Sequence, residues 1–121
     1  MRTALSLVLL LHGVAHLVGF VVPWRLLESD ETPYKTTLFA GRVDVGDLGI
    51  KVVGLLWLAT AAAFAVAAWA FWRGQAWAPS FVGTTAAFSL VLSLIAWPDS
   101  RIGVLINALI LAALLVSRGL A

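Results

Sequence analysis

The chain has 121 residues, of which 62% are hydrophobic and 12% are charged. Soluble domains carry about a quarter charged residues, so this composition excludes an ordinary soluble domain and predicts an integral membrane protein in a lipid bilayer. The absence of cysteine excludes disulfide scaffolds, thiolate metal sites and thiol redox chemistry. The net charge is +2 and no basic cluster occurs in the sequence, so nucleic acid is not expected as a partner.

Four apolar runs have the length that a helix needs to cross a bilayer. They lie at about 4–22, 48–71, 80–97 and 102–118. We expect an all-α fold, an antiparallel four-helix integral membrane bundle that forms a single domain over residues 1–121. The first run resembles a signal peptide, but no small-x-small cleavage site follows it, so it is expected to be a retained span.

The boundaries of these spans carry their own signals. Pro23 and Trp24 end the first span, because proline cannot continue the helical hydrogen bonds and tryptophan favours the interface. Asp44 is the expected N-cap of the second span, and Pro79 suits the first turn of the third. The short turn at 97–100 predicts that the last two spans are antiparallel neighbours.

The connection 23–47 is too polar to span a membrane and too long for a tight turn. We expect an extramembrane or interfacial loop there, and loops of this length are often functional. Its middle, residues 34–40, lies along the interface or folds back over the bundle. The sequence leaves both arrangements open.

Charge is divided unevenly between the two ends of the predicted bundle. The end with both termini and the 73–77 turn carries basic residues only, namely Arg2, Arg73 and Arg118. The other end carries all six acids and five basic residues, namely Glu28, Asp30, Glu31, Asp44, Asp47, Asp99, Arg25, Lys35, Arg42, Lys51 and Arg101. A count of Lys and Arg alone favours the acidic end as cytoplasmic, whereas the purely basic segments close to the span ends favour the terminal end. We expect a bacterial inner membrane protein with both termini in the cytoplasm.

Two histidines lie within the first span. His12 and His16 are four residues apart, so they share one helix face at a separation of about 6 Å along the axis. At similar depths, three further spans place polar side chains. These are Thr85, Ser89 and Ser93 in the third span, Asn107 in the fourth, and Lys51 with Asp47 near the start of the second. Because exposing polar groups to lipid is costly, we expect a polar interior in the half of the bundle nearer the acidic end.

Three interpretations of the histidine pair remain open. Both rings could hold the bundle together through hydrogen bonds to the hydroxyl and amide side chains. His12 and His16 could instead bind a divalent metal ion or a haem, although the chain supplies no cysteine, and no acid at that depth, to complete a ligand set. They could also handle protons, since histidine titrates near neutrality.

The turn into the last span carries a pattern of the form W-x-D-x-[KR]-x-G-x-x-x-N, matched by Trp97, Asp99, Arg101, Gly103 and Asn107. With this turn, about 70 residues of the last three spans resemble the four-helix membrane region of an uncharacterised bacterial protein family. The resemblance implies a four-helix membrane fold and no particular activity.

Two looser resemblances concern size and span number. The chain is similar in length to the small multidrug resistance transporters, but these depend on a glutamate in the first helix, where this chain has only His12 and His16. That difference argues against drug–proton exchange. The span pattern also resembles that of the DoxX-like four-helix proteins.

The sequence contains no recognisable pattern for a nucleophile with its base, a pair of catalytic acids or a complete set of metal ligands. We therefore expect a non-catalytic accessory or assembly partner of a larger membrane protein. One alternative is a transporter or binding protein for a small ligand or ion, acting as a homo-oligomer. Its site would use His12, His16, Lys51, Ser89, Asp99, Arg101 and Asn107. A second alternative is a membrane enzyme in which His16 works with Asp99 or Lys51 as acid–base partner.

Overall fold

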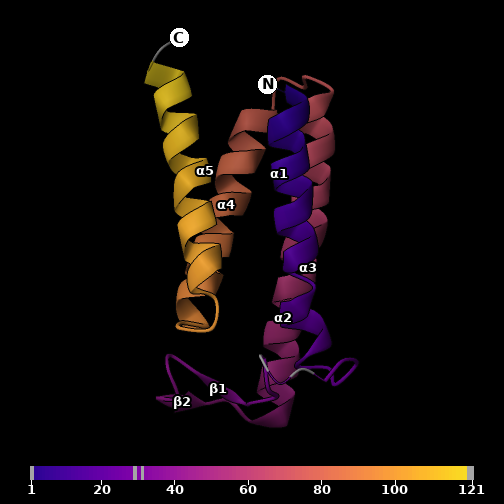
Figure 1. The fold of residues 1–121 in the computed structure, drawn as a ribbon, viewed down its shortest axis with the longest axis vertical. Helices are drawn as coiled ribbons and strands as arrows, with labels where there is room; N and C mark the ends of the chain where they lie inside the picture. The colour runs from indigo at the N-terminus through magenta and orange to yellow at the C-terminus, as the bar shows by residue number, and fades with distance from the viewer. Residues whose placement is uncertain (1, 29, 31, 120–121) are drawn as a thin grey trace.

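The computed structural model describes residues 2–28, 30 and 32–119, with side chains up to residue 117. Glu31 and the side chain of Arg118, both used above to orient the bundle, lie outside the described part. The helices are α1 (Arg2–Ala15), α2 (Val18–Val21), α3 (Gly46–Trp72), α4 (Ala78–Ile95) and α5 (Arg101–Gly119). They form an antiparallel bundle with both termini at the same end (Figure 1). This confirms the predicted four-helix fold.

Three segments are long and apolar enough to cross a membrane, namely Arg2–Val21, Gly46–Trp72 and Ala78–Ile95. A fourth apolar helix, α5, runs antiparallel to α4 (Figure 1). Many large apolar side chains point outward from these helices, Leu11 and Leu105 among them. In a bilayer such side chains face acyl tails, so the exposure that would be a liability in water fits an integral membrane protein.

The first span is not the continuous helix that the sequence predicts. It is interrupted at His16 and Leu17, between α1 and α2. The imidazole Nδ1 of His16 donates a hydrogen bond to the carbonyl oxygen of His12 at 2.7 Å. The backbone N–H of His16 is 3.3 Å from that oxygen and 3.0 Å from the carbonyl oxygen of Gly13. The His16 side chain thus competes with its own backbone N–H for the carbonyl oxygen of His12. The backbone here forms i→i−3 hydrogen bonds, as in a 3₁₀-helix.

The other boundaries are within two residues of those predicted. Pro79 lies in the first turn of α4, as expected. The N-cap position of α3 is Val45, not Asp44, and Val45 makes no capping side-chain bond. Asp44 nevertheless accepts a hydrogen bond from the backbone N–H of Gly46 at 2.9 Å, so its carboxylate serves the helix start from one position further out.

The helices pack as two pairs, α1 with α3 and α4 with α5, and α4 also contacts α3. Small residues allow close approach within the first pair: a Cβ added at Gly13 would lie 2.7 Å from the Cβ of Phe64. The core cluster lies on the terminal side of the histidines, around Leu9, Phe64 and Val82. Towards the loop end the ribbon of α4 leans away from α1 and α3 (Figure 1).

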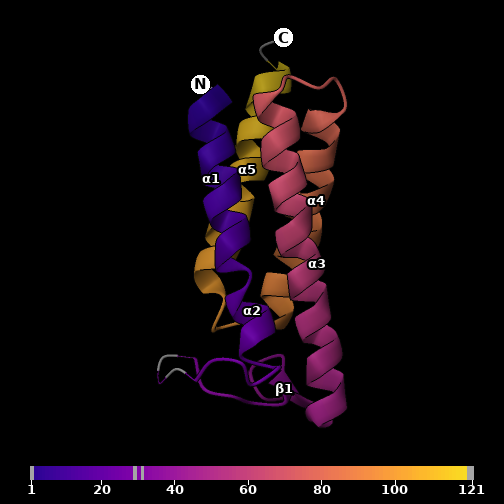
Figure 2. The same ribbon diagram turned by 90° about the vertical axis from the view of Figure 1, so that its right-hand side faces the viewer.

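The connection 23–47 folds back over the open end of the bundle, which is one of the two arrangements left open above. It contains a short antiparallel ladder that the sequence did not reveal, β1 (Thr37–Leu38) and β2 (Val43–Asp44). The backbone N–H groups of Phe39 and Ala40 donate to the carbonyl oxygens of Ile95 and Trp97, at 2.9 and 3.2 Å. The loop thereby satisfies carbonyl groups at the end of α4 and lies beneath the helices (Figure 2).

Candidate functional site

A cavity of about 600 Å³ lies between the two helix pairs at the loop end. His12 and His16 line its inner part, and the β1–β2 connection with the turn at 97–100 lines its outer part. Most of the remaining wall is aliphatic or aromatic, including Val53, Trp57 and Ile106. Small-molecule sites in proteins are typically concave spaces of about 300–1,000 Å³ with apolar walls and a few polar groups, so the cavity has the size and character of a binding site.

Four buried polar side chains join the helix pairs at the inner end of this cavity. His12 Nε2 is 3.0 Å from Asn107 Oδ1, and Asn107 Nδ2 donates to Ser89 Oγ at 2.8 Å. Ser89 Oγ is in turn 2.5 Å from His16 Nε2. With the bond from His16 Nδ1 to the His12 carbonyl, these contacts close a ring that we call the histidine network. Its members come from α1, the interruption after it, α4 and α5.

Two aromatic side chains of α3 hold the imidazole rings in place. The ring of Trp57 lies 5.1 Å from that of His16, and Phe64 lies 4.9 Å from His12, measured between ring centroids. The two imidazoles stand edge to face at 4.6 Å. Trp57 and Phe64 are seven residues apart and so share one helix face, a periodicity that could have placed both beside the histidines.

The other hydroxyl groups of the predicted polar interior lie outside the histidine network. Thr85 and Ser93 are buried, as expected for side chains that turn away from lipid. Within the described chain, Thr85 forms no hydrogen bond with either histidine, and the hydroxyl oxygen of Ser93 has no partner. Residues four apart on α4 share a face but lie about 6 Å apart along the helix axis, so only Ser89 is level with His16.

The charged residues predicted for the site lie at its outer end or outside it. Asp99 lines the cavity mouth and forms an ion pair with Lys35. Lys35 is not among the site residues predicted from the sequence. Arg101 is exposed. In the described chain, neither Asp99 nor Lys51 is hydrogen-bonded to His16, so the acid–base arrangement considered above is not formed.

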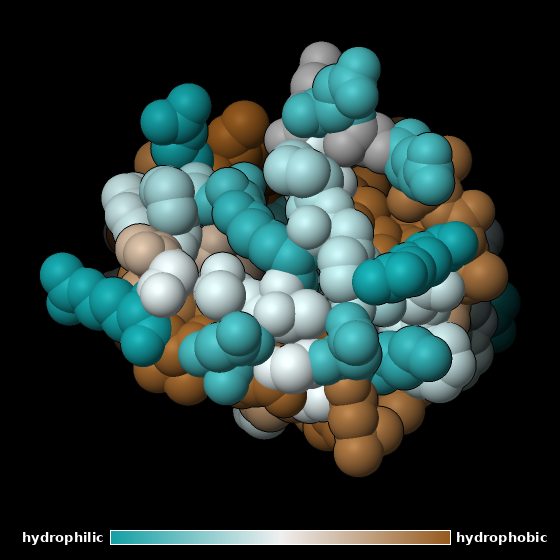
Figure 3. Space-filling model, turned by 90° about the horizontal axis from the view of Figure 1, so that it is seen from below, coloured by the Kyte–Doolittle hydropathy of each residue, from teal (hydrophilic) through white to brown (hydrophobic). Residues whose placement is uncertain are grey.

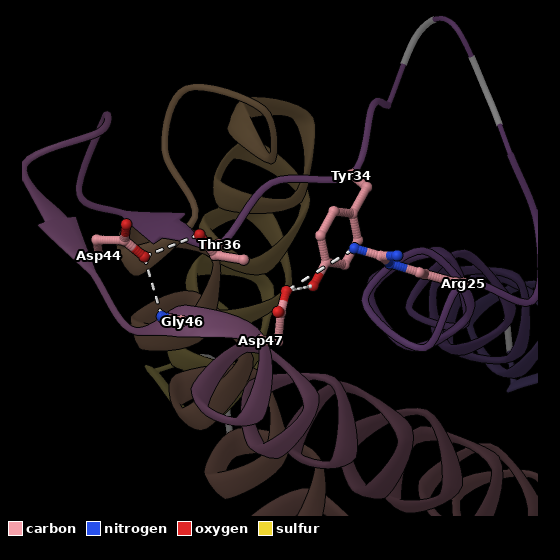
Figure 4. A network of polar contacts seen from close by, with 6 residues as sticks. All are labelled: Arg25, Tyr34, Thr36, Asp44, Gly46 and Asp47. Carbon is pink, nitrogen blue, oxygen red and sulfur yellow. Dashed lines mark hydrogen bonds and ion pairs between the residues drawn. The ribbon is translucent and has the colours of Figure 1, made fainter.

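Asp47 and Lys51 are four residues apart near the start of α3, a spacing that favours an ion pair, but they do not form one in the described chain. Asp47 accepts a hydrogen bond from the hydroxyl group of Tyr34 and lies 3.8 Å from the guanidinium of Arg25 (Figure 4). The ammonium group of Lys51 instead lies over the ring of Trp24, 5.4 Å from its centroid. The loop folds back against the start of α3 and supplies these partners, which helical spacing alone cannot anticipate.

Two ionisable side chains of the loop 23–47, Asp44 and Tyr34, have shifted pKa values. Hydrogen bonds from the Gly46 N–H and the Thr36 hydroxyl stabilise the Asp44 carboxylate and lower its pKa (Figure 4). The hydrogen bond to Asp47 raises the pKa of the Tyr34 hydroxyl group. Hydrophilic side chains and side chains of intermediate hydropathy cover most of this end of the molecule, with hydrophobic ones mainly towards its margin (Figure 3). This end therefore has the character of a surface in contact with water or lipid headgroups.

The proposed metal ligands have little left to offer a metal ion. His16 Nδ1 and Nε2 and His12 Nε2 all form hydrogen bonds within the histidine network, which leaves His12 Nδ1. Among the residues that the structure describes, no group of three or more His, Cys, Asp or Glu side chains is placed to hold a metal ion. Metal binding by this pair would require the network to open.

Two positions of the turn pattern, Gly103 and Asn107, have a structural explanation in this chain. A Cβ added at Gly103 would lie 2.9 Å from Ser93 Oγ, so glycine permits the close approach of α5 to α4. Asn107, one helical turn further along α5, then reaches the histidine network. The hydroxyl group of Ser100 donates to the carbonyl oxygen of Ser93 at 2.5 Å and fixes the turn between the helices.

Comparisons of the chain with protein-family models, curated protein sequences and solved structures found no match.

Proposed function

We propose that this chain is a small integral membrane binding protein, and that its cavity takes up a small, largely apolar molecule without catalysing a reaction on it. The single observation that carries this proposal is the cavity of about 600 Å³ that ends on the histidine network. This proposal takes up the binding alternative raised from the sequence, and the cavity between the helix pairs supports it.

The wall of the cavity supports an apolar ligand. Side chains such as Val53, Trp57 and Ile106 offer an apolar molecule contact area, and burial of apolar surface is the main source of affinity in such sites. Charge is confined to the outer end, where Lys35 and Asp99 neutralise each other. A strongly charged ligand would meet no unpaired partner at the inner end of this space.

The proposal places the protein in a bacterial inner membrane with both termini in the cytoplasm. The terminal end of the bundle carries Arg2 and Arg73 close to helix ends, and the acids of the described chain lie at the other end. Short basic segments next to spans favour the cytoplasmic side. The cavity then lies at the periplasmic end of the bundle, next to the loop 23–47.

An accessory role beside a larger membrane protein and assembly into a homo-oligomer remain predictions from the sequence. A binding protein of this size can deliver its ligand to a partner, and its apolar exterior suits helix packing as well as lipid.

The test uses two neighbouring valines of α3. Val53 lines the cavity, whereas Val52 is exposed on the outer surface of the bundle. We expect protein purified in mild detergent to retain a small molecule at close to one per chain, identified by mass spectrometry of an organic extract. Val53→Trp places a larger side chain in the cavity and should reduce this content at least about tenfold, since the indole ring occupies space and wall contacts that the ligand would use.

The matched control is Val52→Trp, which adds the same side chain on the lipid-facing side. It should leave the extracted molecule at the wild-type amount. Equal content in all three proteins, or no small molecule above the level of protein-free detergent, would contradict the proposal.

A further inference from the structure

We infer that the cavity prefers molecules that present a hydrogen-bond donor, a hydroxyl or N–H group, on a mostly apolar body. The inference rests on the proposed function and adds the chemical class of the ligand. It follows from an account of every proton in the histidine network.

Carbonyl oxygens fix the direction of two bonds in the network, because they can only accept. His16 Nδ1 must donate to the carbonyl oxygen of His12, and His12 Nε2 must donate to Asn107 Oδ1. Asn107 Nδ2 donates to Ser89 Oγ, so the Ser89 hydroxyl proton is free to be donated to His16 Nε2. Both imidazoles are then neutral, and each of the four bonds in the ring contains one proton. The second N–H of the Asn107 amide takes no part in the ring, and Asn107 does not line the cavity.

The opposite orientation of the Asn107 amide leads to a different charge. Its Oδ1 would accept the Ser89 hydroxyl proton, so His16 Nε2 would have to donate to Ser89. Since His16 Nδ1 already donates to the His12 carbonyl, the ring would carry two protons and a positive charge. A charge at this depth without an acid partner is costly, so the neutral arrangement is favoured.

In the neutral arrangement, one ring nitrogen of the two histidines takes no part in the histidine network. His12 Nδ1 carries a lone pair and no proton, and it has no hydrogen-bond partner within the described chain. The fully enclosed side-chain atoms without a partner are, among the described residues, Ser6 Oγ and Ser93 Oγ, and His12 Nδ1 is not one of them. His12 lines the cavity, and we take Nδ1, the ring nitrogen of His12 outside the histidine network, as the atom that a ligand contacts.

The inner end of the cavity therefore offers a ligand an acceptor and no donor from the histidine network. A hydroxyl or N–H group satisfies His12 Nδ1, whereas a ketone, an ether or a hydrocarbon leaves it unpaired. This preference comes mainly from weaker binding of ligands without a donor, because their complexes leave a buried polar atom without a hydrogen-bond partner, which is costly.

Three probes of nearly the same shape separate these cases: 2-naphthol, 2-methoxynaphthalene and naphthalene. The protein is placed in lipid nanodiscs with ¹⁵N-labelled histidine, and its two histidines give four ring-nitrogen signals. We expect 2-naphthol to bind about tenfold more tightly than either other probe, as one net hydrogen bond allows. The His12 Nδ1 signal should shift with 2-naphthol alone.

Two outcomes would contradict the inference in different ways, and a variant of His12 serves as a control. Equal affinity of all three probes, with no selective shift of His12 Nδ1, would overturn the donor preference while leaving the binding cavity intact. Failure of all three to bind would contradict both the cavity as a binding site and its preference. In His12→Phe the 2-naphthol advantage should disappear while naphthalene still binds, which separates loss of the acceptor from loss of the fold.

Discussion

Asn107, together with Ser89, ties the two helix pairs together. Its side chain is fully buried and bonds both His12 of α1 and Ser89 of α4. Interhelical hydrogen bonds within membranes contribute about 0.6 kcal/mol on average and up to about 1.7 kcal/mol. We expect Asn107→Ala, which removes two of them, to lower the free energy of unfolding by about 1–2 kcal/mol.

The measurement is unfolding by titration with a denaturing detergent in mixed micelles, followed by circular dichroism. Leu109→Ala on the same helix is the matched control, because Leu109 is 60% exposed and faces outward. It should change stability by no more than about 0.5 kcal/mol. Similar losses in both variants would show that Asn107 contributes only through its volume.

At this scale the sequence predicts which residues meet but not how they bond. Depth in the membrane and helical spacing place His12, His16, Ser89 and Asn107 in one layer, and the structure joins them. The bond of His16 to the carbonyl oxygen of His12 accompanies a local loss of regular helix, which no pattern in an apolar run reveals. The partners of Asp47 and Asp99 come from a loop whose path carries no periodic signal.

The β1–β2 loop is the element whose stability should respond to acid. Asp44 accepts bonds from Thr36 and Gly46, and these lower its pKa below the ordinary value of 3.8. A carboxyl group whose pKa is depressed by folding stabilises the folded form above its unfolded pKa, and this contribution is lost as pH falls through the folded pKa. We therefore expect the loop to open more readily below about pH 4 than at neutral pH.

Amide hydrogen exchange of the 36–46 segment, measured between about pH 3 and pH 6 and corrected for intrinsic exchange, reports this opening. Asp44→Asn should abolish the acid-dependent part, because the amide keeps the acceptor oxygen without the titrating charge. Glu28→Gln is the control, since the Glu28 carboxylate forms no ion pair with described residues. An acid response that survives in Asp44→Asn would assign it to another group.

Elements differ in how well a single sequence defines them. α3, α4 and α5 follow from apolar length, Pro79 and the short turn, and their ends lie within two residues of the prediction. The β1–β2 ladder has two residues in each strand, too few for alternation to be visible. Tertiary contacts with the end of α4 fix that ladder, so it could only be found in the structure.

For the whole molecule, the unequal distribution of charge makes a prediction about orientation. Both termini and the 73–77 turn lie at one end, and the loop 23–47 lies at the other (Figure 1). Because the chain has no cysteine, Ala76→Cys and Arg42→Cys each introduce a single thiol, at exposed positions of opposite ends. A membrane-impermeant maleimide added to intact cells should label Arg42→Cys and spare Ala76→Cys until the membrane is permeabilised.

The physical basis of this expectation is the position of the basic residues, not their number. Arg2 and Arg73 adjoin helix ends at the terminal end, where the described chain has no acid, whereas Lys35 and Arg25 at the other end are paired with Asp99 and Asp47. Lys and Arg near span ends are retained in the cytoplasm during insertion, and acids contribute little. The reverse labelling pattern would mean that the larger count of five basic residues decides orientation, and the cavity would then open to the cytoplasm.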